Sequence, residues 1–391
     1  MRTNPLAVMA CTLVALFEGV DLQAAGVAAP KLAPALGLKP AELGWFFSAS
    51  TFGLMLGAAI GGWMSDRFGR KVTLLCSVLL FGILSILTGL ANDIDGLIVA
   101  RFFTGVGLGG ALPNLLAMVA ENTRLDRRRA AVGILYAGLP CGGALASLVS
   151  YFGSDPTDWR IIFYVGGVLP LAALLPLTKL LPANQTSVMA GKSGFASAVF
   201  GDRRTVTSLL LWGGFFLALL AMYLLLSWLP SLLIGRGLAR PDAALVQMAF
   251  NLFGAAGSIA TGWLMDRAGR KMLVVAGIFA AAGLSVILVS SLPVSLAISL
   301  AVGGALGATV SGTQAVLYGL APTLYPRHVR GTGVGVGVAA GRLGSAAGPM
   351  LAGLLLSAGQ SPEKVLLALL PVLGICCVAT LFLTLRPATN D

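Results

Sequence analysis

Four ionisable side chains lie inside long apolar segments of the sequence. Glu18 and Asp21 stand three residues apart in the first such segment, so a helix would present them on one face. Arg101 and Arg342 stand in two later apolar segments. Because a charged group in a bilayer is costly unless it is paired or hydrated, these residues indicate an ion pathway or a site for a charged solute.

A carboxylate beside an arginine could couple proton binding to a change of conformation. Burial increases the proton affinity of a carboxylate and a neighbouring arginine decreases it, so motion that moves the arginine or admits water changes proton occupancy. We predict Asp21 and Arg101 as this pair, with Glu18 beside them, and all four charges facing one central cavity. Arg342 is the predicted anion anchor, because a guanidinium donates two parallel hydrogen bonds to a carboxylate and stacks on aromatic rings. The alternative is that the charges only neutralise one another and fix helix packing.

Other polar and aromatic residues of the apolar segments are candidates for substrate contacts. Ordinary packing is the alternative for each one, but together they suit an aromatic ring that carries a hydroxyl group. These residues are Gln23, Asn114, Tyr136, Trp212, Tyr223, Gln314 and Tyr318.

Composition shows what kind of element must position these residues. Hydrophobic residues make up 57% of the 391 positions and charged residues only 10%, and the mean hydropathy is +0.91. Apolar runs of about 20 residues, each long enough to cross a hydrocarbon core of about 30 Å, recur along the whole chain. We predict an all-α membrane protein with twelve transmembrane helices, the tenth too long for one simple span. The runs lie near 6–30, 41–64, 72–91, 95–120, 130–152, 160–181, 206–229, 243–264, 272–292, 294–325, 332–357 and 364–385.

The net charge of +11 is explained by where the basic residues fall. Most of the 26 Lys and Arg residues lie in loops on one side of the predicted spans, including Arg124, Arg127, Arg128 and Arg129. This asymmetry follows the positive-inside rule and predicts that both termini are cytoplasmic. The lipid bilayer is therefore the expected surroundings, and nucleic acid is not an expected partner. The first run is expected to stay as a helix rather than to be a cleaved signal, because two acids interrupt it.

An internal repeat divides the chain into halves. Gly61–Lys71 and Thr261–Lys271 share a G-W-x-x-D-R-x-G-R-K pattern, and each copy falls between the second and third span of its half. A duplicated six-helix unit predicts this placement. We expect an N-terminal six-helix bundle over residues 1–181, a cytoplasmic linker over 182–205 and a C-terminal six-helix bundle over 206–391.

The repeated segment resembles the G-x-x-x-D-R-x-G-R-[RK] signature of the major facilitator superfamily. The resemblance implies the major facilitator fold and a cytoplasmic gate, in which each Asp meets Arg and Lys and latches one half to the other. The residues concerned are Gly62, Asp66, Arg67, Gly69, Arg70, Lys71, Asp266, Arg267 and Arg270. At Glu121, two alternatives stay open: a basic loop that only sets topology, or a gating contact of this acid with neighbouring arginines.

Within that superfamily, Phe17–Gly26 resembles the D-G-x-D motif of the aromatic acid:proton symporters, with Glu18 at the first acidic position. Residues 106–115, 227–230 and 339–344 are similar to the branch of bacterial permeases for 3-(3-hydroxyphenyl)propionate. The resemblance implies import of an aromatic carboxylate, of hydroxyphenylpropionate or hydroxybenzoate type, together with a proton across the bacterial inner membrane. It also implies roles for Arg101, Glu121 and Arg342 in coupling and binding.

Two other functions compete with this one. A proton-driven exporter of drugs or aromatic compounds would typically carry G-P-x-x-G-G in the fifth span, whereas residues 138–143 read G-L-P-C-G-G. A transporter-like membrane sensor of aromatic acids would need a signalling partner. Enzymatic activity is not expected, because no nucleophile and base, metal constellation or cofactor motif stands out. The G-x-G-x-x-G at 105–110 lies in a membrane span rather than after a strand, so no nucleotide site is expected. We expect no cofactor, the proton being the coupling ion, and a functional monomer.

Overall fold

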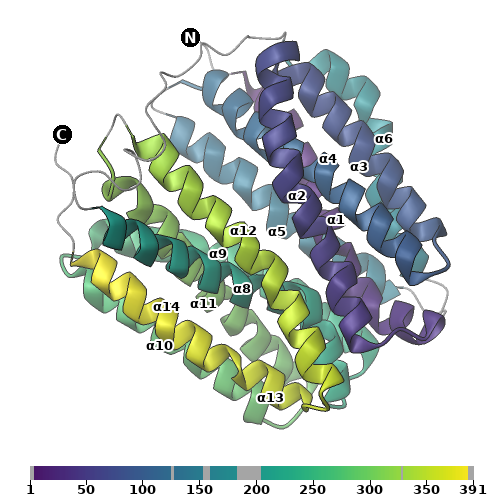
Figure 1. The fold of residues 1–391 in the computed structure, drawn as a ribbon, viewed down its shortest axis with the longest axis vertical. Helices are drawn as coiled ribbons and strands as arrows, with labels where there is room; N and C mark the ends of the chain where they lie inside the picture. Colours follow the sequence, from purple (N-terminus) through teal and green to yellow (C-terminus); the bar gives the residue numbers. More distant parts are fainter. Residues whose placement is uncertain (1–3, 125–126, 153–158, 183–203, 327–328, 386–391) are drawn as a thin grey trace. The chain divides into compact units, whose positions relative to one another are not determined.

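The computed structural model describes residues 4–124, 127–152, 159–182, 204–326 and 329–385, and the backbone alone at Arg129. Every regular element in these ranges is a helix (Figure 1). The helices, in chain order, are α1 (Pro5–Leu36), α2 (Pro40–Phe68), α3 (Arg70–Leu90), α4 (Ile94–Glu121), α5 (Arg128–Phe152), α6 (Trp159–Leu180), α8 (Thr205–Gly235), α9 (Arg240–Arg267), α10 (Lys271–Ser291), α11 (Leu296–Leu320), the 3-10 turn η2 (Ala321–Thr323), α12 (Arg330–Ser357), α13 (Pro362–Leu367) and α14 (Leu369–Thr384).

Twelve helical stretches of the described chain are long and apolar enough to cross a membrane. Ten are single helices, the tenth in chain order is α11 continued by η2, and the last combines α13 and α14. The predicted all-α membrane protein with twelve spanning helices is therefore confirmed. The tenth run is long because a 3-10 turn extends its helix, not because it contains a second span.

The first helix is longer than predicted. It does not end at Pro30 but passes through Pro30 and Pro34 to Leu36, and the left-handed Gly37, with φ 64°, follows it. A proline removes one backbone donor, and packed membrane helices tolerate this where side chains of neighbouring helices bond the exposed carbonyls. Near Pro30, the hydroxyl of Ser150 of α5 donates to the carbonyl of Val27 at 3.2 Å.

The chain forms two compact units. One comprises Met1–Met189 and Ala239–Met248, and the other comprises Ala190–Leu238 and Ala249–Asp391. Within the predicted linker, residues 183–203 lie outside the described part of the chain. The predicted bundle limits at 181 and 206 therefore stay a prediction.

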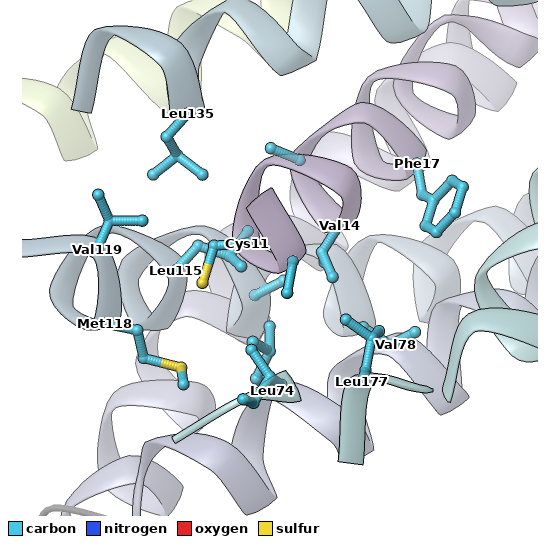
Figure 2. Packing of buried hydrophobic residues seen from close by; sticks show 14 of the residues in the cluster. Cys11, Val14, Phe17, Leu74, Val78, Leu115, Met118, Val119, Leu135 and Leu177 are labelled. Atoms are coloured by element: carbon cyan, nitrogen blue, oxygen red, sulfur yellow. The ribbon is translucent and has the colours of Figure 1, made fainter. Parts of the chain in front are cut away.

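In the first unit, glycines let the spanning helices approach closely. A Cβ atom at Gly53 or Gly57 of α2 would overlap the backbone of α4, and one at Gly105 or Gly109 of α4 would overlap the backbone of α2. The glycine-rich 105–110 segment is thus a helix-packing surface, as its position in a membrane span indicates. Figure 2 shows the apolar core at one end of this unit, built from α1, α3, α4, α5 and α6 around Cys11 and Val14.

In the second unit, α8 and α12 pack along their length in parallel (Figure 1). Gly337 lies beside Leu211 and Phe215, and eleven residues later Gly348 lies against the carbonyl of Leu220. Because the residue numbers increase together along both helices, the register between them is fixed. Small residues on α12 therefore determine which α8 side chains stand beside each α12 side chain.

In each unit, an arginine donates hydrogen bonds to carbonyls at the C-terminal end of the third spanning helix. Arg160 of α6 donates to the carbonyl of Gly89 at 2.6 Å, at the end of α3. Arg236, which follows α8, donates to the carbonyls of Val289 and Leu292 at the end of α10 and pairs with Glu363 of α13 at 3.2 Å. Guanidinium groups supply the donors that the last helical carbonyls otherwise lack.

All five cysteines are free thiols. Cys11 and Cys376 are buried, Cys377 is half-buried, and Cys76 and Cys141 are exposed.

Candidate functional site

Helix α1 carries Glu18 and Asp21 deep inside the first unit. Their side chains are 1% and 0% exposed. Since the helix continues to Leu36, the two residues lie about 27 and 22 Å from its C-terminal end, further than an end at Pro30 would give. The two acids therefore sit near the middle of a helix long enough to cross a bilayer with turns to spare.

Asp21 forms an ion pair with Arg101 of α4. The guanidinium Nη1 donates to Oδ2 of Asp21 at 2.8 Å, and Nη2 donates to the backbone carbonyl of the same residue at 3.0 Å. Arg101 is 1% exposed, so both charges are removed from solvent. A buried pair of this kind is stable only because each charge neutralises the other.

Two more helices complete the surroundings of this pair. The hydroxyl of Ser85 of α3 lies 2.7 Å from Oδ1 of Asp21 and 3.0 Å from the carbonyl of Phe163, both of which can accept its proton. The Arg101 guanidinium also stands 5.9 Å from the centre of the Phe163 ring on α6. Both carboxylate oxygens of Asp21 thus have a donor, and four helices contribute to one site. Within the described residues, Nε of Arg101 has no hydrogen-bond partner.

The ion pair joins α1 to α4, and its hydrogen bonds reach α3. Loss of the pair would therefore alter contacts among several helices at once. The role of Asp21, Glu18 and Arg101 in proton coupling stays a prediction.

The remaining candidates of the first unit are spread along three helices. Gln23 of α1 is buried, and its amide lies against Gly143 of α5, where a Cβ atom would overlap it. Asn114 of α4 donates to the carbonyl of Gly110 in its own helix at 2.8 Å. Tyr136 of α5 is 43% exposed. The substrate contacts of these three side chains stay predictions.

In the second unit, Arg342 of α12 forms a hydrogen bond with a phenol hydroxyl. Its Nη1 donates to the hydroxyl of Tyr223 of α8 at 2.9 Å, and both side chains are half-buried. A guanidinium and a phenol hydroxyl side by side can both donate hydrogen bonds to one carboxylate. This geometry suits the predicted anion anchor.

The other predicted substrate-contact residues of the second unit lie on α8 and α11. Tyr318 of α11 packs edge-on against Phe215 of α8, with ring centres 4.9 Å apart. Gln314 lies one turn before Tyr318, and Trp212 lies on α8 almost one turn before Phe215. Phe215 was not among the predicted residues, since a phenylalanine in an apolar helix gives no signal in a sequence.

The first copy of the repeated motif forms a contact that the sequence did not predict. Arg70, at the start of α3, pairs with Glu121 at the end of α4 at 2.6 Å. Lys71 donates to the carbonyl of Leu181 at 3.0 Å, whereas Asp66 and Arg67 are exposed. Glu121 thus forms an ion pair with the motif itself. The predicted contact of Asp66 with the basic cluster, and the choice at Glu121 between a topology-setting loop and a gating contact, stay predictions.

Both copies of the motif place an arginine over a tryptophan one turn earlier. The guanidinium carbon of Arg67 lies 5.6 Å from the ring centre of Trp63, and that of Arg267 lies 4.2 Å from the ring of Trp263. In the first copy, Gly69 has a φ of 84° and makes the turn between α2 and α3. In the second copy the charged side chains are also exposed: Asp266, Arg267 and Arg270.

Of the basic residues that follow the fourth span, Arg129 is described by its backbone alone. Within the described residues, no group of three or more His, Cys, Asp or Glu side chains could hold a metal ion.

Comparison with known proteins establishes the family. The model of the Major Facilitator Superfamily matches residues 11–323 and 241–391. The 3-(3-hydroxy-phenyl)propionate transporter of Escherichia coli (strain K12) is 40% identical over 382 residues, which cover 96% of this chain and 93% of that protein. The gallate transporter of Pseudomonas putida is 33% identical and covers 90% of this chain and 86% of its own length.

Solved structures agree on the fold. The crystal structure of a D-xylose-proton symporter superposes with a TM-score of 0.76 at 19% sequence identity, over 98% of this chain and 97% of that one. The family model and the relatives show the family, and the fold agrees with them. The chain belongs to the major facilitator superfamily and is a multi-pass membrane transporter rather than an enzyme.

Proposed function

We propose that this chain is a proton-coupled symporter that imports a small aromatic carboxylate, of the hydroxyphenylpropionate or hydroxybenzoate type, by alternating access. The observation that carries this proposal is the buried Asp21–Arg101 ion pair, with its 2.8 Å contact and its ring of four helices. A titratable acid buried at the middle of a membrane helix is costly and is typical of proton relays in transporters.

The substrate class rests on the relatives and on Arg342. Two relatives are named for the transport of 3-(3-hydroxyphenyl)propionate and of gallate, both aromatic acids. In this chain, Arg342 and Tyr223 offer a guanidinium and a phenol hydroxyl side by side, which together can bind one carboxylate. Tyr318 of α11, which packs against the buried Phe215 of α8 and is 41% exposed, can pack against a ring.

Charge balance links the two events. A proton that enters from outside and binds Asp21 adds one positive charge to the protein, and an organic anion bound at Arg342 offsets it. The empty deprotonated protein and the fully loaded protein therefore carry the same net charge, whereas each partly loaded state does not, so the empty and fully loaded states are the ones that can rearrange. The proton then leaves Asp21 on the cytoplasmic side together with the anion, and the ion pair forms again. Glu18, one turn away on α1, is the second acid of this pathway.

The membrane setting follows from the same resemblance and the charge pattern. We place the protein in the bacterial cytoplasmic membrane with both termini inside, as the excess of basic residues in the loops on one side favours. We further propose that one copy of the chain suffices for transport.

Uptake by proteoliposomes tests the proposal directly. The purified protein is reconstituted, and entry of radiolabelled 3-(3-hydroxyphenyl)propionate is measured with and without an inward proton gradient, beside benzoate and a non-aromatic monocarboxylate. Accumulation that requires the gradient and is confined to aromatic acids is the expected result.

Two outcomes would contradict it. Accumulation that is equal with and without the gradient would remove proton coupling. A failure to take up any acid, together with extrusion of an aromatic compound against an inward proton gradient, would identify an exporter and make Arg342 a structural counter-ion instead of a substrate anchor.

A further inference from the structure

Gln314 of α11 carries a hydrogen-bonding group that the protein leaves unused. Its amide nitrogen Nε2 is buried and, within the described residues, has no hydrogen-bond partner. Buried polar groups are nearly always bonded, and an exception is expected to serve a purpose such as binding a ligand. The buried amide of Asn114 in α4, by contrast, donates to the carbonyl of Gly110 in its own helix.

The register of the helices places Gln314 at the level of Arg342. Tyr318 of α11 meets Phe215 of α8, and three short connections, each reversing a membrane-crossing chain, make α11 antiparallel to α8. Gln314, one turn earlier on α11, therefore stands one turn further along α8, near Leu219. Gly341 of α12 also packs against Leu219 of α8. The backbone of Arg342, the next residue of α12, therefore lies at the same height along α8 as Gln314.

Phe215 shows that these three helices converge. Its ring contacts Tyr318 of α11. A Cβ atom added at Gly341 of α12 would lie 3.2 Å from the Cβ atom of Phe215. Tyr318 is 41% exposed, so the ring is not covered by protein on every side. An anion-binding guanidinium, two aromatic rings and an unsatisfied amide therefore belong to one short stretch of the second unit.

We propose that Gln314 recognises the ring hydroxyl of the substrate and selects hydroxylated aromatic acids over unsubstituted ones, an inference that rests on the proposed function. A phenolic hydroxyl both donates and accepts, so it can satisfy the amide through either its nitrogen or its oxygen. The substrate carboxylate binds Arg342, and its ring lies along Tyr318. An acid without the hydroxyl would leave the amide unbonded, and sites built to bond a hydroxyl discriminate well against analogues that lack it.

The test compares two acids in one assay. Proteoliposome uptake of 3-(3-hydroxyphenyl)propionate and of 3-phenylpropionate is measured for the wild-type protein and for Gln314→Met, which keeps the length and volume of the side chain but cannot donate a hydrogen bond from its end. We expect the wild type to favour the hydroxylated acid in kcat/KM, and Gln314→Met to lose about two- to tenfold of that preference. Uptake of the unsubstituted acid should be unchanged or improved.

Thr313→Val is the matched control. Thr313 neighbours Gln314 in α11, is fully buried, and donates its hydroxyl to the carbonyl of Val310 in its own helix at 2.8 Å. The change removes one buried hydroxyl from the same turn without touching the amide, so the preference for the hydroxylated acid should stay as in the wild type.

The outcomes separate this inference from the proposed function. Wild-type protein that transports neither acid contradicts the proposed function itself. Wild-type protein that transports both acids equally well overturns the role of Gln314 without any variant, even if Gln314→Met fails to fold. A wild-type preference that Gln314→Met retains in full, or that Thr313→Val loses to the same extent, also overturns it.

Discussion

Replacement of Asp21 by asparagine separates transport from proton coupling. The change keeps the shape of the side chain and an oxygen for Ser85 or Arg101, but removes the negative charge that faces the guanidinium at 2.8 Å. We expect Asp21→Asn to lose uphill accumulation driven by a proton gradient. Exchange of labelled for unlabelled substrate at equal concentrations, which requires no net proton movement, should persist.

The same substitution has a cost in stability that follows from burial. Arg101 is 1% exposed, so in Asp21→Asn its charge stays buried without a counter-ion. Removal of one partner of a buried pair destabilises a protein by about 3–5 kcal/mol, and the oxygen that asparagine retains should keep the effect near the lower end. The double variant Asp21→Asn/Arg101→Gln removes both charges and should recover much of this stability while accumulation stays absent.

Thermal unfolding in detergent and the two transport assays together measure these effects. Ser85→Ala serves as the control, because it removes one neutral hydrogen bond donor to Asp21 but leaves the ion pair, and should cost about 1 kcal/mol without abolishing accumulation. Normal gradient-driven accumulation by Asp21→Asn would refute the assignment of this carboxylate as the obligatory proton site. A double variant that is no more stable than Asp21→Asn would refute the charge argument.

Three further predictions follow from other contacts. Arg342→Lys should raise the KM for the acid about tenfold with a smaller effect on kcat, because a lysine cannot donate two parallel hydrogen bonds to a carboxylate; an unchanged KM would remove Arg342 from the site. Glu121→Gln should destabilise the protein by no more than about 1 kcal/mol in thermal unfolding, with less effect at high salt, because the pair with Arg70 is partly exposed; a salt-independent loss would contradict this. Gly344→Ala should cost about 1–3 kcal/mol, because its Cβ would overlap the backbone of α8, whereas Gly213→Ala, which has no neighbour within 4 Å, should be neutral or slightly stabilising.

The spanning helices could be predicted from the sequence because the bilayer imposes a simple rule. Every backbone polar group must be bonded inside the membrane, so long apolar runs become helices almost regardless of detail. The rule does not specify where a helix ends. For that reason Pro30 gave a wrong end for α1, which continues to Leu36.

The pairing of Asp21 with Arg101 could be expected for a related reason. An isolated charge in the membrane interior is so costly that a nearby opposite charge is its natural partner. The neutral members of the same site carry no comparable signal, because Ser85 and Phe163 resemble many other residues of the apolar helices. Their roles become visible only when α3 and α6 are placed beside α1 and α4.

The ion pair of Arg70 with Glu121 shows that contacts between residues far apart in the sequence are hard to predict from local patterns. Several arginines follow Glu121 directly in the sequence, and proximity along the chain favoured them as partners. The turn between α2 and α3 instead brings Arg70 to the end of α4, a distance in sequence that no local pattern reveals. The register of α8, α11 and α12, on which the role of Gln314 depends, is likewise set by glycines whose packing partners lie on other helices.

The central claim is that a proton enters with each aromatic anion through Asp21, and the pH inside proteoliposomes tests it most directly. A pH-sensitive dye is enclosed in the vesicles, and 3-(3-hydroxyphenyl)propionate is added outside at neutral pH, with empty vesicles and Asp21→Asn vesicles as controls. We predict that the lumen acidifies faster with the wild-type protein than in either control, in step with entry of the radiolabel. Entry of the radiolabel while the luminal pH follows the control vesicles would contradict proton symport through this residue.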